Sequence, residues 1–388
     1  MSIKIKTLVA ILAVLSIILS FNTCTKFVYA DELKDNIDEQ LENIDLNGLE
    51  EYFNDNVDFA ANIDFFTYVN KILNGEYDFE FTSFSTYVIN LLKENVRSVL
   101  PIFIEIFIIA LICGILQKLK SSMLSNGVGE LILFVGLLSV ILILSGQIIT
   151  VWKNVKIVIE NIAKLTEIMS PIILTLMVAS GGNVSASVYK PAVAFLSNGI
   201  INVVLTIILP LIALMIIFNT LSNFSSSIKL EKFSELASSI IKWIIGLIIA
   251  IFGIFLSIQG ITSATFDGIS IKATKFAISN SVPLIGGFLK DGFDLVVAGS
   301  ILIKNAVGLT CIVALFYTII SPIINIAIFS LLLKFISAII EPITDNKISS
   351  FCMGMSKCIT YLSVALITVA FMLFITILLI IISANSFI

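Results

Sequence analysis

The sequence of 388 residues contains no histidine. Histidine is the commonest general base, proton shuttle and metal ligand of proteins, so its absence counts against most hydrolytic and metal-dependent chemistry. Charged residues are also scarce, at 13%, whereas they make up about a quarter of soluble proteins. With a mean hydropathy of +1.08 and 58% hydrophobic residues, the chain is predicted to be an all-α protein that crosses a membrane several times.

The cysteines show no close Cys-x-x-Cys pairing of the kind that holds zinc or a redox disulfide. The five are Cys24, Cys113, Cys311, Cys352 and Cys358. The sequence also lacks a P-loop, a nucleophile elbow, a zincin motif and a Rossmann glycine pattern. Asp267, Asp291 and Asp294 lie at no recognisable motif spacing. We therefore expect no catalytic residues, no metal site, no cofactor and no enzymatic activity.

The N-terminal segment, 1–30, has the organisation of a secretory signal peptide. Lys4 and Lys6 precede the apolar run 7–21, and residues 28–30 offer small side chains at the positions that a signal peptidase reads. The mature chain is expected to begin at the next residue, outside the membrane.

Most of the acidic charge lies in the segment that follows. Residues 31–97 hold sixteen Asp or Glu against four Lys or Arg, although the net charge of the whole chain is only −4. Apolar residues such as Ile37, Leu41 and Ile44 recur at helical spacing, so three or four short amphipathic helices are predicted, forming a small exported domain. The domain is either a solvated cap over the membrane part or a docking surface for an extracytoplasmic partner.

The remainder, 98–388, is predicted to form six to eight transmembrane or re-entrant helices. The first span, 99–116, supplies nearly the ~20 apolar residues that a crossing needs. Lys118 and Lys120 place its far end in the cytoplasm by the positive-inside rule. Glu105 lies within this span, where a charge costs at least ~2.5 kcal/mol unless it is paired or hydrated. We interpret Glu105 either as a contact to another helix or as a pore-lining, ion-coupling carboxylate.

Two stretches of the membrane part read alike. Residues 147–210 align without a gap on 259–322, at a constant offset of 112 residues. The matched pairs include Gln147 with Gln259, Pro171 with Pro283 and Pro210 with Pro322. Such duplication is typical of many transport proteins, and the repeat units are predicted at about 131–240 and 241–384. The copies are inverted if their short Pro-led pieces cross the membrane, and parallel if those pieces re-enter.

Each copy contains a Pro-led apolar piece that glycines interrupt. Pro171–Ala179 is too short to cross and is followed by Gly181 and Gly182, while the piece at Pro283 carries Gly286 and Gly287. Broken segments are tolerated at membrane depth only where they are buried or line a cavity. The pair therefore indicates a central pathway, although Gly and Pro are also ordinary packing devices in membrane helices.

The long runs between these pieces are expected to bend. Pro210 should kink or divide the run 192–218, and Pro322 should produce a tight hairpin or a sharply bent pair of helices. The linker 152–167 contains three lysines and begins with Trp152, so it is predicted to lie along the membrane interface.

Four polar side chains lie deep in apolar sequence, where they could line an aqueous path or form hydrogen bonds between helices. They are Gln147, Gln259, Lys304 and Asn305. Lys304 follows the apolar run 295–303, so its ammonium cannot easily reach an interface. We hypothesise that Lys304 and Glu105 each face protein or a water-filled cavity and neutralise one another. The alternative is that Lys304 caps a short half-helix at an interface.

Several motifs in a fixed order carry a resemblance that covers nearly the whole chain. After the signal peptide and the acidic segment they are Met169-Ser-Pro, Ala179-Ser-Gly-Gly182, Ser257-Ile-Gln-Gly260, Val282-Pro-Leu-Ile-Gly286 and Ile301-Leu-Ile-Lys-Asn-Ala-Val-Gly308. Together they resemble the stage III sporulation protein AE family of endospore-forming bacteria.

This resemblance implies a permease-like subunit of a channel complex that links mother cell and forespore. Such a subunit would lie in the mother-cell membrane around the forespore, with its N-terminal domain exported. The implied partners are the bilayer and the other membrane subunits of the complex, with no nucleic acid. An alternative from another class is a self-contained secondary transporter of a small solute or ion.

Overall fold

The computed structural model describes residues 31–57, 65–76, 81–123, 126–224, 230–281, 286–343 and 346–383. The expected signal peptide lies outside these residues. Within them every regular element is a helix, as predicted. In chain order the helices are α2 (Asp31–Glu42), α3 (Asn47–Asn56), α4 (Phe65–Leu73), α5 (Phe81–Met123), α6 (Asn126–Ala179), α7 (Asn183–Ala194), the π-helical η2 (Phe195–Ile200), α8 (Ile201–Val203), the π-helical η3 (Val204–Ile208), α9 (Leu209–Phe224), α10 (Glu231–Ser281), α11 (Gly286–Ile340) and α12 (Asn346–Ile382).

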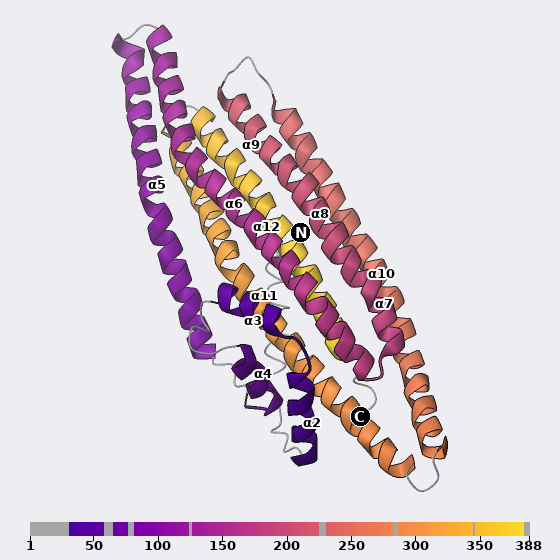
Figure 1. Ribbon diagram of the computed structural model, residues 1–388. Helices are drawn as coiled ribbons and strands as arrows, with labels where there is room; N and C mark the ends of the chain where they lie inside the picture. Colours follow the sequence, from indigo (N-terminus) through magenta and orange to yellow (C-terminus); the bar gives the residue numbers. More distant parts are fainter. Residues whose placement is uncertain are drawn as a thin grey trace.

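Six of these units contain stretches long and apolar enough to cross a membrane. They are α5, α6, the continuous helix from α7 to α9, α10, α11 and α12. They run alternately in opposite directions along one elongated bundle, and α2, α3 and α4 lie toward the end where α5 begins and α12 finishes (Figure 1). The described residues therefore match the lower limit of six predicted spans.

The centre of the bundle is α12. Of its most apolar stretch 67% is buried, against 22–39% for the other five. Hydroxyl groups join it to α11: Ser330 lies 3.0 Å from both Ser356 and Thr360, and Ser337 lies 2.9 Å from Ser349. Small residues of this kind let two helix backbones approach closely where there is little hydrophobic force between helices.

Several helices are much longer than a membrane is thick. α6 has 54 residues and α11 has 55, which at 1.5 Å per residue gives about 80 Å, against a hydrocarbon core of about 30 Å. Each must extend well beyond the bilayer. In α6 the exposed side chains are mostly large and apolar before Trp152, as at Leu142, but mostly charged from 153 to 167. The second half of α6 is therefore the part that leaves the lipid.

This finding corrects the prediction for 152–167. The segment does not lie along the interface but continues α6 without a break. At this level Asn161 donates a hydrogen bond of 2.8 Å to Asn56 in α3. The indole N–H of Trp152 donates a hydrogen bond of 3.4 Å to the carbonyl of Leu209, so the half-buried Trp152 side chain contacts a neighbouring helix.

The Pro-led pieces also differ from expectation. Pro171 lies inside α6, which continues to Ala179, so the first piece is not re-entrant. Pro283 lies outside the described residues, and Gly286 and Gly287 are the first residues of α11. A proline inside a helix costs roughly 3 kcal/mol through one lost hydrogen bond and a steric clash, which a long packed helix can sustain.

Pro322 and Pro210 have different effects. α11 passes through Pro322 without the predicted hairpin. Pro210 is the second residue of α9 and follows η3 directly, while Pro191 stands in α7 shortly before η2. The wider π-helical turns absorb the irregularity next to each proline. The run 192–218 therefore contains two π-helical segments but is not divided, and the chain keeps one direction from α7 to α9.

The two aligned stretches form helix pairs in the same order and direction (Figure 1). The first pair is α6 with α7–α9, and the second is α10 with α11. The first helix of each pair ends at Ala179 and at Ser281, 102 residues apart rather than 112. Pro171 lies inside α6, whereas Pro283 lies outside the described residues, so the equivalence of the two prolines stays a prediction. Any repeat is parallel, and a common origin of the two pairs stays a prediction.

Candidate functional site

Two glycines build the turn between α6 and α7. Gly181 has a φ of +84°, a left-handed conformation that favours glycine. Its N–H bonds the carbonyl of Val178 at 2.9 Å, and the N–H of Gly182 bonds the carbonyl of Met177 at 2.8 Å. These bonds form a Schellman motif, which ends α6 and turns the chain at once into α7. A Cβ added at Gly181 would also lie 2.6 Å from Ile271 of α10.

A buried carboxylate from α10 faces the start of α7. Asp267 is fully buried and accepts hydrogen bonds from the N–H groups of Val184 at 2.9 Å and Ser185 at 3.3 Å, and from the Ser185 hydroxyl. Gly182 stands at the N-cap position of α7, which has no side-chain cap of its own. The free N–H groups and positive dipole of a helix N-terminus favour an anion. Asp267 therefore caps α7 from a different helix.

A buried cation lies near this carboxylate. Lys304 of α11 is fully buried, and its ammonium donates to the carbonyl of Ser383, directly after α12. Carbonyls at the end of a helix lack helical partners and favour a cation. Lys304 also interacts electrostatically with Asp267. We call Asp267, Lys304, Ser185 and the Ser383 carbonyl the Asp267–Lys304 cluster, which joins α7, α10, α11 and α12 at one end of the bundle.

The hypothesis that Glu105 neutralises Lys304 is wrong. Glu105 is exposed on α5, and its neighbour Phe103 stacks on Phe335 of α11 at 5.8 Å. Along α11, Phe335 lies about 45 Å from Lys304 at 1.5 Å per residue. The part of the hypothesis that placed Lys304 inside protein is consistent with its burial, whereas Glu105 does not face the interior of this chain.

The other predicted polar residues are scattered. Gln147 is half-buried in α6, and the side chain of Gln259 lies outside the described part of the chain. Asn305, next to Lys304, has a buried Oδ1 atom without a hydrogen-bond partner among the described residues. A buried acceptor of this kind costs about 1–3 kcal/mol if it stays unsatisfied. Asn305 thus extends the polar region around Lys304.

Sequence reasoning missed Asp267. It is the only acidic residue between Glu235 and Asp291, and that isolation was the available signal. An ionisable group alone in apolar sequence is buried only with a partner or with water. The partner could not be predicted, because it depends on how α10 packs against α7 and α11.

The acidic N-terminal helices pack close to the cluster. In α2, Gln40 accepts a hydrogen bond of 2.8 Å from Ser300, which is one helical turn before Lys304 on α11. In α3, the hydroxyl of Tyr52 lies 3.2 Å from that of Thr318, also on α11. Burial raises the pKa of Tyr52 to about 12. These two contacts fix α2 and α3 along α11 between Ser300 and Thr318.

Six helices apolar enough to cross a membrane define a polytopic helical membrane protein. Residues 63–384 match the model of the family described as stage III sporulation protein AE, and the chain belongs to that family. The resemblance seen in the motifs is thus confirmed.

One curated relative is stage III sporulation protein AE of Bacillus subtilis (strain 168). It is 26% identical over 280 residues, which cover 72% of this chain and 70% of the relative. No solved structure matches the chain.

Proposed function

We propose that this protein is the permease-like membrane subunit of a channel complex that links mother cell and forespore. It lies in the mother-cell membrane around the forespore, with α2–α4 on the exported side, and works with other membrane subunits. Membership of a stage III sporulation family and the six apolar helices support this role.

The observation that carries the proposal is the length of α6 and α11, 54 and 55 residues, because a single crossing needs only about 20. Secondary transporters hold their substrate near the middle of the bilayer and need little protein beyond it. Here roughly half of α6 and of α11, about 40 Å at 1.5 Å per residue, extends from the membrane on the side of α2–α4. A body of that size is suited to contacts with partners across an intermembrane space, where a solitary carrier would have no use for it.

The Asp267–Lys304 cluster fits this role as a structural tie. It holds the start of α7 and the end of α12 to α10 and α11 at the exported end. A path that opens at this end must move these helices relative to one another. Asp267 and Lys304 therefore stabilise the closed arrangement of the helices at this end. Removal of the two charges should impair the sporulation function more than membrane insertion.

Cross-linking in sporulating cells tests the proposal. A photoreactive amino acid at Glu42, which is exposed in α2, should yield adducts with other membrane subunits of the sporulation complex, while the same group at Leu142, which faces lipid, should not. Liposomes that contain only the purified chain should not accumulate labelled amino acids, nucleotides or rubidium ions. Uptake by the chain alone would contradict the proposal and establish a self-contained carrier.

A further inference from the structure

Two exposed lysines lie between α10 and α12. The ammonium of Lys242 in α10 lies 6.0 Å from the centre of the Tyr361 ring in α12, a distance at which a cation is attracted to an aromatic ring. Lys357 stands one helical turn before Tyr361 and is exposed, although α12 is the most buried of the six long helices. The side of α12 that carries Lys357 and Tyr361 therefore faces α10 without being covered by it. We call Lys242, Lys357 and Tyr361 the lysine site.

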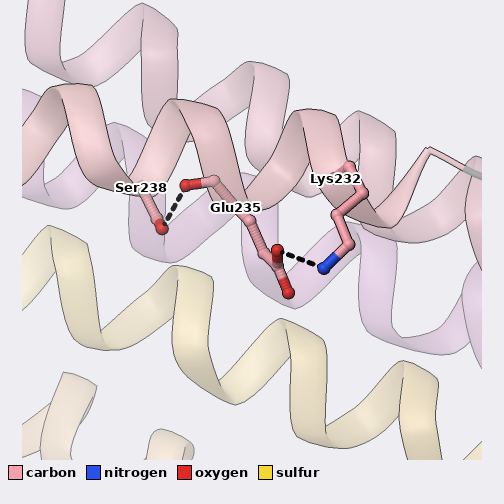
Figure 2. A network of polar contacts seen from close by, with 3 residues as sticks. All are labelled: Lys232, Glu235 and Ser238. Atoms are coloured by element: carbon pink, nitrogen blue, oxygen red, sulfur yellow. Dashed lines mark hydrogen bonds and ion pairs between the residues drawn. The ribbon is translucent and has the colours of Figure 1, made fainter.

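The positive charge of the lysine site is only partly balanced. Glu235, two turns before Lys242 on α10, interacts electrostatically with Lys357. Its carboxylate also forms an ion pair of 2.8 Å with Lys232, on the side of α10 that faces the yellow α12 in Figure 2. Lys242 forms no ion pair with the described residues, and Glu231 is about 16 Å from it along the helix. The lysine site thus keeps a net positive charge.

Contacts along α9 fix the height of Lys242 in the bundle. The rings of Phe233 in α10 and Phe218 in α9 lie 5.9 Å apart. The two helices run in opposite directions (Figure 1), so Lys242, nine residues after Phe233, is level with Leu209, nine residues before Phe218. The carbonyl of Leu209 accepts the hydrogen bond from Trp152, where the exposed surface of α6 changes from apolar to charged. Lys242 therefore lies at this boundary of the lipid.

A second set of contacts gives the same height for Tyr361. The amide of Asn219 in α9 donates to the carbonyl of Phe351 in α12 at 3.1 Å. Leu209 is ten residues from Asn219 along its helix. Tyr361 is ten residues from Phe351 in the same direction across the bundle, so it is level with Leu209. Lys357, four residues earlier on α12, lies about 6 Å further toward the lipid interior.

The two tryptophans of the chain lie at this same level. The sequence contains only Trp152 and Trp243, and Trp243 follows Lys242 directly and is 80% exposed. Tryptophan is enriched at the membrane–water interface, where its ring sits among the lipid headgroups. The lysine site is therefore placed at the height of the headgroups, on a side of the bundle that the described residues leave open.

We propose that the lysine site binds the headgroup phosphate of an anionic phospholipid in the leaflet on the side of α2–α4. Lysine binds phosphate as a compact point charge, and basic sites between transmembrane helices attract anionic headgroups. The acyl chains would lie along Leu236 and Ile240 of α10, which are exposed and lie on the lipid side of Lys242. A zwitterionic lipid would bring its own cation to the lysines, so the site favours a lipid with a net negative charge. This binding does not depend on the proposed function or on the transported species.

The fluorescence of Trp243 tests the proposal. In the full-length chain with Trp152→Phe, Trp243 is the only tryptophan, and the protein is reconstituted into vesicles of phosphatidylcholine. Phosphatidylglycerol with bromine near the headgroup should quench Trp243 more strongly than the same fraction of brominated phosphatidylcholine. Lys242→Gln and Lys357→Gln should each reduce the relative affinity for phosphatidylglycerol about fivefold. Lys242→Arg and Lys357→Arg should preserve it, because they keep the charge.

Lys272→Gln is the matched control, because Lys272 is also exposed on α10 but lies about 45 Å from Lys242 along the helix. It should leave the relative quenching unchanged, and all variants should keep the same melting temperature in detergent. Equal quenching by the two brominated lipids would overturn the proposal, as would undiminished selectivity when both glutamine substitutions are combined. Inorganic phosphate added at constant ionic strength should not remove the excess quenching. If it does, the site takes a soluble anion and the assignment to a lipid is wrong.

Discussion

At the scale of single residues, two side chains of opposite charge, Asp267 and Lys304, are fully buried at one end of the bundle. Lys304 could be predicted to face protein, because an ammonium that deep in apolar sequence has no route to water. Asp267 could not be paired with it from the sequence, since the two residues come from different helices and meet only through packing. Glu105 was singled out by the same argument as Lys304, but it lies on the exposed side of α5.

Substitutions that remove the charges of Asp267 and Lys304 should have non-additive effects on the free energy of unfolding. Asp267→Asn removes the charge that accepts the hydrogen bonds of Val184 and Ser185 and should destabilise the protein by about 1–3 kcal/mol. Lys304→Met should cost less, because Asp267 keeps its hydrogen bonds from Val184 and Ser185. The double variant should be more stable than the sum of the single effects predicts. Unfolding of the detergent-solubilised proteins by denaturant measures all three.

Asp291→Asn is the matched control for this cycle, because Asp291 is exposed on α11. It should change the free energy of unfolding by less than about 0.5 kcal/mol. If the changes in free energy of unfolding caused by the two cluster substitutions are additive, the charges of Asp267 and Lys304 do not interact. The cluster would then not stabilise the closed arrangement in the way proposed.

At the scale of elements, apolar run length predicted the six crossings, and proline and glycine predicted the interruptions less well. Gly181 ended α6 because it supplies a positive φ within a Schellman motif. Pro171 and Pro322 did not end their helices, because each removes only one hydrogen bond from a helix that neighbours hold in place. The sequence shows where a helix is weakened, but whether it breaks depends on packing that no local pattern records.

The contact between α9 and α12 depends on a glycine. A Cβ added at Gly354 would clash with Oδ1 of Asn219. The amide of Asn219 donates to the carbonyl of Phe351 at 3.1 Å, so Gly354→Ala should displace it and cost about 1–3 kcal/mol. Gly292→Ala, where the added Cβ meets nothing within 4 Å, should instead stabilise α11 by about 0.5–1 kcal/mol. Equal melting temperatures of the two variants would show that this close contact is absent.

At the scale of the whole molecule, the acidic helices are held to the membrane part by few polar contacts, of which Tyr52 is the most buried. The Thr318 hydroxyl donates to the carbonyl of Ala314 at 2.8 Å, so the Tyr52 hydroxyl is the donor in their shared bond. Donation requires the neutral phenol. Ionisation of Tyr52 therefore opposes the attachment of α3 to α11.

Because the pKa of Tyr52 differs between the folded and unfolded states, the stability of the protein should fall at alkaline pH. The pKa of Tyr52 is raised from 10.0 to about 12 in the folded protein, so above pH 10 the unfolded state releases a proton that the folded state keeps. Stability is complete below pH 10 and falls as the pH rises toward 12, by about 3 kcal/mol for a shift of this size. Tyr52→Phe should cost about 1 kcal/mol at neutral pH and should lose less stability above pH 10. If the stability difference between the two proteins is constant from pH 9 to 12, Tyr52 does not provide this link.

Six crossings are an even number, so both ends of the described chain should lie on the same side of the membrane. α2–α4 lie toward the end of the bundle where α12 finishes (Figure 1), so both ends should be on the exported side, while the turn after α11 lies at the opposite end. Cysteines placed at Glu42 and at Ile382, both exposed, should react with a membrane-impermeant maleimide on intact protoplasts of non-sporulating cells that produce the protein, where the exported side faces the medium. A cysteine at Glu341, exposed in the turn after α11, should react only after permeabilisation.

Reaction of Glu42→Cys without Ile382→Cys on intact protoplasts would mean an odd number of crossings. Because the lysine distribution alone left the side of the C-terminus open, this experiment tests the helix count and the exported position of α2–α4 together.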